Sequence, residues 1–192
     1  DIKYAKEFGY VIKLLGVAKN TEDGIEVKVH PMLIPNNHPL ANVNDAFNAV
    51  FVHGKAMDDA MFMGRGAGQM PTASAVVGDI IDVCRNIVHD SCGRIGCCCY
   101  KNLEVKDITD TKSKFFLRLE VADKQGVLAN IASVLGNSGV SIAQVVQKSG
   151  KDGVAELVII TAEVLEKNFN DAMAVFKGLS AVKNIAGVIR VY

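Results

Sequence analysis

Residues 115–192 alternate between strand-like and helix-like hydrophobic patterns, and the order of these patterns constrains the fold more than any other feature. Residues 115–121 alternate apolar and polar side chains, which predicts a strand with one buried face. Residues 125–136 and 166–179 space apolar side chains three and four positions apart, which predicts two amphipathic helices. Further strands are expected at 140–147, 155–161 and 182–191. This order predicts a ferredoxin-like βαββαβ fold, an antiparallel sheet with two helices on one face.

The first ninety residues carry patterns that predict a mixed or antiparallel sheet with helices, so the whole chain is expected to be an α+β protein. The alternation over 25–30 predicts a half-buried strand, and the preceding Asp23-Gly24 pair is a strong hairpin signal. The segment 31–44 holds three Pro and four Asn, so we expect an ordered loop there. The expected elements are a helix at 2–8, strands at 10–18, 25–30, 47–53 and 60–63, and a helix at 71–88.

Between these halves lies a cysteine-rich segment without hydrophobic periodicity. We therefore expect one domain at 1–90, a linker at 91–113 and a second domain at 114–192. Zinc sites usually show two well-separated ligand pairs, which are absent, although His89 with the nearby thiols leaves a soft-metal site open. We expect free thiols, no disulfide framework and no metal site. The five cysteines are Cys84, Cys92, Cys97, Cys98 and Cys99.

The charge balance excludes several classes of protein. Lys plus Arg and Asp plus Glu both total 21, so there is no basic excess for nucleic acid. The hydrophobic fraction of 49% argues against a disordered chain. The longest uncharged stretch, 125–147, carries too many Asn, Gln, Ser and Gly residues for a membrane span. No signal-peptide pattern opens the sequence, and we expect a cytoplasmic protein.

A glycine-rich turn before the helix at 71–88 is the first candidate site. Gly64-Arg65-Gly66-Ala67-Gly68 allows close approach of a ligand, and the following helix start offers N–H groups to an anion. Thr72 and Ser74 add hydroxyl groups. The alternative is a plain strand-to-helix turn, and the dinucleotide fingerprint G-x-G-x-x-G is not present.

The second candidate site is the segment Asp123–Leu128, which joins the first strand of the second domain to its first helix. Asp123 is expected to cap this helix, and Gly126 leaves room for a ligand at the helix start. Amide donors at this position suit the carboxylate of an amino acid, whereas the alternative is simple helix capping. The four histidines show no catalytic pairing, and no nucleophile with an adjacent base is evident.

Five sequence blocks of the first half resemble the C-terminal half of homoserine dehydrogenase, and residues 115–192 resemble an ACT domain. The resemblance implies NAD(P)-dependent interconversion of aspartate semialdehyde and homoserine, on the path to threonine, methionine and isoleucine. Arg65 departs from the Pro that is common in this family. The blocks are YVIKLLG at 10–16, VKVHPMLIP at 27–35, FNAVFV at 47–52, MFMGRGAG at 61–68 and PTASAVV at 71–77.

The resemblance also implies roles for named residues. In the complete enzyme the cofactor would contact Gly64, Gly66, Ala67 and Gly68. An amino-acid effector, threonine first, would bind between two ACT domains and cause feedback inhibition in a homodimer or larger homo-oligomer. Its expected contacts are Asp123, Gly126, Val127 and Leu128 on one chain and Ser141 and Gln144 on the partner.

The family's dinucleotide-binding half and its catalytic Asp and Lys are not in the sequence, which begins at Asp1 without Met. We therefore expect part of a longer polypeptide, with no catalytic residue, no bound cofactor and no turnover by the chain alone. The alternatives are a free-standing ACT-type amino-acid sensor and a dimerisation module without a ligand.

Overall fold

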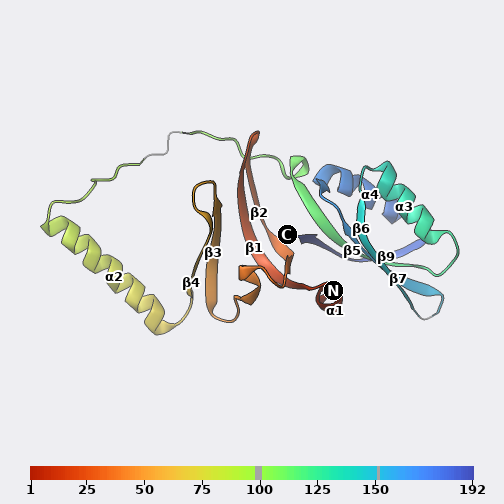
Figure 1. Ribbon diagram of the computed structural model, residues 1–192, viewed down its shortest axis with the longest axis horizontal. Coiled ribbons are helices and arrows are strands. Elements are labelled where there is room, and N and C mark those ends of the chain that lie inside the picture. The colour runs from red at the N-terminus through yellow and green to blue at the C-terminus, as the bar shows by residue number, and fades with distance from the viewer. Residues whose placement is uncertain (98–100, 151) are drawn as a thin grey trace. The chain divides into compact units, whose positions relative to one another are not determined.

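The computed structural model describes residues 1–97, 101–150 and 152–192, and these form two compact units (Figure 1). The first unit comprises residues 1–36 and 103–192, and the second comprises residues 37–102. The helices are α1 (Ile2–Glu7), α2 (Gln69–Val88), α3 (Val127–Asn137) and α4 (Glu166–Gly178), with 3₁₀ turns at Pro39–Asn42 and Ile108–Asp110. The strands are β1 (Tyr10–Thr21), β2 (Gly24–Pro35), β3 (Phe47–Gly54), β4 (Asp58–Arg65), β5 (Lys112–Ala122), β6 (Ile142–Ser149), β7 (Val154–Thr161), β8 (Val164–Leu165) and β9 (Val182–Val191).

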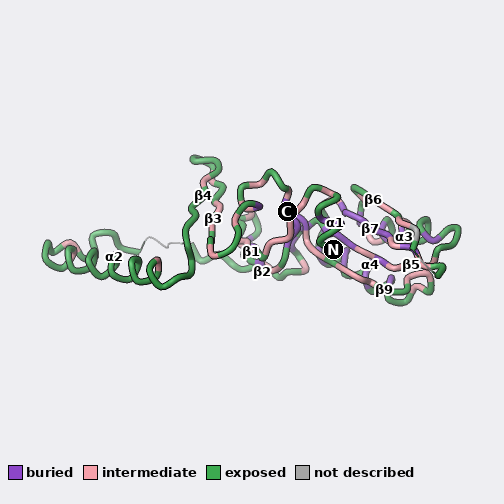
Figure 2. The backbone as a smooth tube through the Cα atoms, turned by 90° about the horizontal axis from the view of Figure 1, so that it is seen from below, coloured by how far each residue is buried: buried purple, intermediate pink, exposed green. Residues whose placement is uncertain are grey.

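The last eighty or so residues form the expected βαββαβ fold. Their four long strands lie in the order β9-β5-β7-β6, and each neighbouring pair is antiparallel. The predicted alternation of apolar and polar side chains in β5 is confirmed, because Phe115, Leu117 and Leu119 are buried beneath α3 and α4. The Phe115 ring stacks on Phe169 of α4, with 3.7 Å between the ring centroids. This core contains most of the buried hydrophobic residues of the first unit (Figure 2).

The hairpin β1–β2 extends this sheet, which differs from the prediction. The expected sheet of the first half combined all four of its strands, but β2 pairs in parallel with β9 at Met32 and Leu33. Strands β3 and β4 pair only with each other, as a separate antiparallel hairpin, among the described residues. The expected grouping was wrong because hairpin signals fix which strands are neighbours locally and carry no information about distant partners. The predicted domain limits at 90 and 114 stay a prediction.

The expected loop at 31–44 was partly wrong, because β2 continues to Pro35 and only the remainder is irregular or 3₁₀ in structure. Prolines are confined to open edges of sheets, where no ladder hydrogen bond is lost. Since β2 pairs with β9 at two positions only, most of its second edge is open. The Pro-rich composition was therefore compatible with a strand.

Helix α1 covers the sheet face opposite α3 and α4. Tyr4 and Ala5 are buried against Phe116, Val158 and other apolar side chains of this face. The Tyr4 hydroxyl donates to Glu156 at 2.5 Å. Burial and this carboxylate together raise the pKa of Tyr4 to about 12. Helix α1 is thus an integral part of the first unit.

In the second unit, α2 spans 20 residues and has no buried residue (Figure 2). The predicted helix is present, but the apolar stripe that suggested it, including Ile80 and Ile87, is exposed among the described residues. A stripe of this kind in a globular protein normally packs on a partner. None of the helices among the described residues is both long enough and apolar enough to cross a membrane.

Candidate functional site

The glycine-rich turn predicted from the sequence lies between β4 and α2. Gly64 and Arg65 end β4, and the Gly66 N–H donates to the Ala46 carbonyl at 3.0 Å. A Cβ built on Gly66 collides with the side-chain amide of Asn48. Gly68 has φ of +124°, a region that L side chains rarely adopt, so glycine is required there, whereas a side chain at Gly66 would have to displace the Asn48 amide.

The start of α2 is open toward this turn. The residue before the helix is Gly68, and no side chain caps the first turn among the described residues. The first N–H groups of a helix lack intrahelical partners and favour an anion. Arg65 does not point its charge at these groups, since its guanidinium lies 5.1 Å from the centroid of the Phe47 ring. The turn therefore offers backbone N–H donors and lets a ligand approach the backbone closely.

The second predicted site differs in detail from expectation. Helix α3 begins at Val127 and its N-cap is Gly126 with φ of +84°, so the expectation that Asp123 caps the helix was wrong. The Asp123 N–H instead donates to the Gly153 carbonyl at 2.8 Å, which ties it to the turn before β7. Asp123 lies three residues before the N-cap, too early to bond the first-turn N–H groups. Those groups consequently have no side-chain cap.

The remaining residues of this predicted site do not meet within one chain. Ser141 accepts through its carbonyl from the Ala162 N–H, at one end of β7, whereas Asp123 bonds to Gly153 beyond the other end. Strand β7 has eight residues, so the two groups lie about 25 Å apart along it. Val127 is buried and Leu128 is partly exposed, while Ser141 and Gln144 are exposed.

A buried charge cluster in the first unit was missed by the sequence reasoning. Glu166, which is 2% exposed, accepts two hydrogen bonds of 2.6 Å from the Arg190 guanidinium and one of 2.9 Å from the Ser113 hydroxyl. The Lys28 ammonium donates to Ser113 Oγ at 3.1 Å and lies 3.6 Å from the Glu26 carboxylate. The cluster joins β2 to β5, β9 and α4.

Over residues 26–29 of β2, the buried face is the polar one. Glu26 and Lys28 are each 8% exposed, whereas Val27 and Val29 are 53% and 73% exposed. The strand is half-buried as predicted, but its apolar face is the open one. A clue was available in the sequence, because polar residues alternate with apolar ones here and Arg190 lies within an apolar strand.

The environment shifts the pKa values of the cluster in directions that follow from its contacts. Burial lowers the pKa of Lys28, although the carboxylates of Glu26 and Glu166 oppose the effect. Burial of Glu166 by itself raises its pKa, but the hydrogen bonds from Arg190 and Ser113 and the nearby cations outweigh burial and lower it. Burial and the Arg190 charge lower the pKa of His30.

The described residues contain no group of three or more His, Cys, Asp or Glu residues that could hold a metal ion. Cys84 and Cys92 are free thiols, and Cys84, Cys92 and Cys97 are all exposed. Cys98 and Cys99 of the predicted thiol cluster lie outside the described residues.

Comparison with known proteins assigns both parts of the chain. Residues 1–81 match the family model of homoserine dehydrogenase, and residues 109–190 match that of the ACT domain. The homoserine dehydrogenases of Pseudomonas aeruginosa and Neisseria gonorrhoeae are 39% and 41% identical to the chain, over 100% and 99% of its length. The crystal structure of a homoserine dehydrogenase from Thiobacillus denitrificans covers 100% of the chain at 39% identity with a TM-score of 0.90.

The fold and the matches define a chain in which a segment similar to homoserine dehydrogenases precedes a βαββαβ domain of the ACT type. Residues 1–81 belong to the homoserine dehydrogenase family and residues 109–190 to the ACT domain family. The chain spans less than half the length of the curated relatives, 46% and 45% of the two named above. It also spans 44% of the Thiobacillus denitrificans protein.

Proposed function

We propose that the chain is the dimerisation and regulatory part of an NAD(P)-dependent homoserine dehydrogenase, which interconverts aspartate semialdehyde and homoserine in the cytoplasm. The observation that carries this proposal is the similarity to homoserine dehydrogenases along the whole chain, including a TM-score of 0.90. The exposed apolar stripe of α2 supports it, because a helix of this kind needs a covering surface from a longer polypeptide.

In the proposed enzyme the turn at 64–68 lies against the cofactor. The residues fit this role, since Gly66 lies against the Asn48 side-chain amide and Gly68 adopts a positive φ. The uncapped start of α2 supplies N–H donors beside the turn. When bound, NAD(P) accepts or donates the hydride. The contribution of this chain is to position the cofactor through Gly64, Gly66, Ala67 and Gly68.

The ACT half is proposed to sense an amino acid, with threonine as the first candidate, and to inhibit the enzyme in response. Gly126 at the uncapped start of α3 leaves backbone N–H groups for the effector carboxylate. Asp123, Val127 and Leu128 would surround it. Because Ser141 and Gln144 lie toward the far end of β7, they would reach this effector only from a second copy of the chain.

A homodimer is supported by an apolar surface on the hairpin β1–β2. Leu14, Val27 and Val29 are all more than half exposed, and the strand register places them on one face. Exposed apolar patches of this kind commonly mark association surfaces. Exposed free thiols at Cys84 and Cys92 fit a reducing compartment.

Joining the chain to the N-terminal half of the Pseudomonas aeruginosa homoserine dehydrogenase tests the oxidoreductase proposal. We expect homoserine-dependent reduction of NAD(P)⁺ by the joined protein and none by the chain alone or by the donor half alone. Turnover by the isolated chain would contradict the proposal that the rest of the catalytic site comes from elsewhere. A folded joined protein without activity would favour the alternative of an amino-acid sensor without catalysis.

A further inference from the structure

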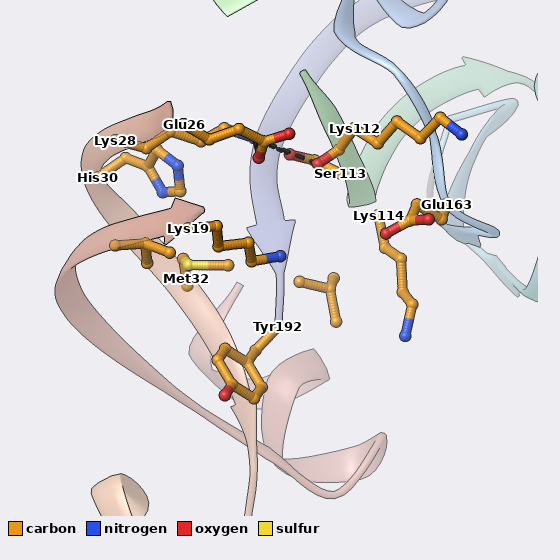
Figure 3. A pocket seen from close by; sticks show the side chains of 12 residues that line it. Lys19, Glu26, Lys28, His30, Met32, Lys112, Ser113, Lys114, Glu163 and Tyr192 are labelled. Atoms are coloured by element: carbon orange, nitrogen blue, oxygen red, sulfur yellow. Dashed lines mark hydrogen bonds and ion pairs between the residues drawn. The ribbon is translucent and has the colours of Figure 1, made fainter. Parts of the chain in front are cut away.

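A cavity of about 320 Å³ lies within the first unit, between the hairpin β1–β2 and the ends of β5 and β9 (Figure 3). Lys19 pairs with Glu26 and Val17 with Lys28 across the hairpin, so these four side chains share the face toward the cavity. The opposite wall comes from Lys112, Ser113 and Lys114 at the start of β5, from Glu163 and from the end of β9. The volume is sufficient for a small metabolite.

The charges around this cavity are unbalanced. Four lysines line it against two glutamates, Glu26 and Glu163. Glu26 is matched by Lys28 at 3.6 Å, and the neighbouring Arg190 is matched by Glu166 at 2.6 Å. None of the other three lysines forms an ion pair with a residue that the structure describes, and only Glu163 opposes them. These three are Lys19, Lys112 and Lys114. The cavity therefore has a positive potential that attracts an anion.

His30 lines the cavity without offering it a polar atom. Both of its ring nitrogens are buried out of reach of a water-sized molecule, so the side chain contributes ring carbons to the wall.

We propose that this cavity binds a small dianion, a phosphomonoester or a dicarboxylate. Lys19 and Lys114 bind its charges, whereas the Lys112 side chain extends away from Lys19 and His30 (Figure 3). The site is separate from the proposed effector loop, because Lys112 and Asp123 lie at opposite ends of the eleven-residue β5, about 30 Å apart. A bound dianion links the hairpin β1–β2 to the ACT sheet. The strand pairing between the hairpin and this sheet involves β2 and β9 at only two positions.

Thermal melting of the chain with inorganic phosphate or with succinate tests this proposal. Each probe is compared with sodium chloride at equal ionic strength. We expect a saturable rise in melting temperature of roughly 4 °C at about 20 mM of at least one probe. A response to phosphate alone identifies a phosphomonoester site, and a response to succinate alone identifies a dicarboxylate site. Equal responses to both probes and to chloride would overturn the proposal.

Variants locate the response. The double substitution Lys19→Gln and Lys114→Gln is expected to weaken the binding of the active probe at least about tenfold, the effect of losing charge-assisted hydrogen bonds. Lys183→Gln, an exposed lysine at the other end of β9, serves as the matched control and leaves the response unchanged. An unchanged response in the double variant would place the anion elsewhere.

Discussion

Glu166→Gln is expected to destabilise the first unit by about 3 kcal/mol, the effect of breaking a buried ion pair. The amide keeps the shape of the side chain but leaves Arg190 and Lys28 without their shared carboxylate. The amide NH₂ that replaces one carboxylate oxygen also faces an N–H group of Arg190, so two hydrogen-bond donors oppose each other. The loss corresponds to a fall in melting temperature of roughly 9 °C, measured by calorimetry or circular dichroism.

Glu163→Gln provides the matched control, because this exposed carboxylate lies three residues earlier. Its effect is expected to stay within about 0.5 kcal/mol. The pKa of Glu166 is lowered in the folded protein, so its contribution is fully present above the ordinary value of 4.5 and is lost as pH falls through the folded value. The stability difference between the parent chain and Glu166→Gln should therefore shrink in acid. A difference that grows below pH 4.5 would contradict this account.

Gly66→Val in the complete oxidoreductase is expected to lower kcat/KM by about 100-fold, a loss typical of displaced positioning groups. A Cβ at this position collides with the side-chain amide of Asn48, so that amide must move and the added side chain takes its place beside the turn at 64–68. The measurement is homoserine-dependent NAD(P)⁺ reduction by the chain joined to the N-terminal half of a relative.

Two further variants separate the turn from a general loss of stability. Gly136→Ala, in α3, meets no atom within 4 Å and is expected to keep full activity. The double variant Asn48→Ala and Gly66→Ala removes the collision and should retain more activity than Gly66→Ala alone. Full activity of Gly66→Val would show that the turn does not position the cofactor.

The ACT half of the fold was predictable because its signals are local. The alternation in β5 and the helical spacing in α3 and α4 each describe one element, and the βαββαβ order leaves few ways to pair the strands. The glycine-rich turn was also predictable, since the positive φ of Gly68 is a requirement that glycine meets without strain.

Other features depend on distant contacts, which periodicity does not report. The parallel pairing of β2 with β9 joins residues about 160 positions apart, and no turn signal specifies it. This pairing buries Glu26 and Lys28 and leaves Val27 open, the reverse of what an alternating pattern usually indicates. The cavity next to His30 follows from the same pairing and was therefore not foreseen.

The proposed regulatory role requires that the ACT half bind an amino acid near Gly126, and isothermal titration of the chain with threonine tests this most directly. Asn and Asp both tolerate the left-handed backbone of Gly126, which makes Gly126→Asn and Gly126→Asp a matched pair that differs in charge. We predict saturable heat at millimolar threonine, with binding to Gly126→Asp at least about tenfold weaker than to Gly126→Asn, because the added carboxylate repels that of the ligand. The absence of heat and of any change in melting temperature at millimolar threonine would contradict a threonine-sensing role.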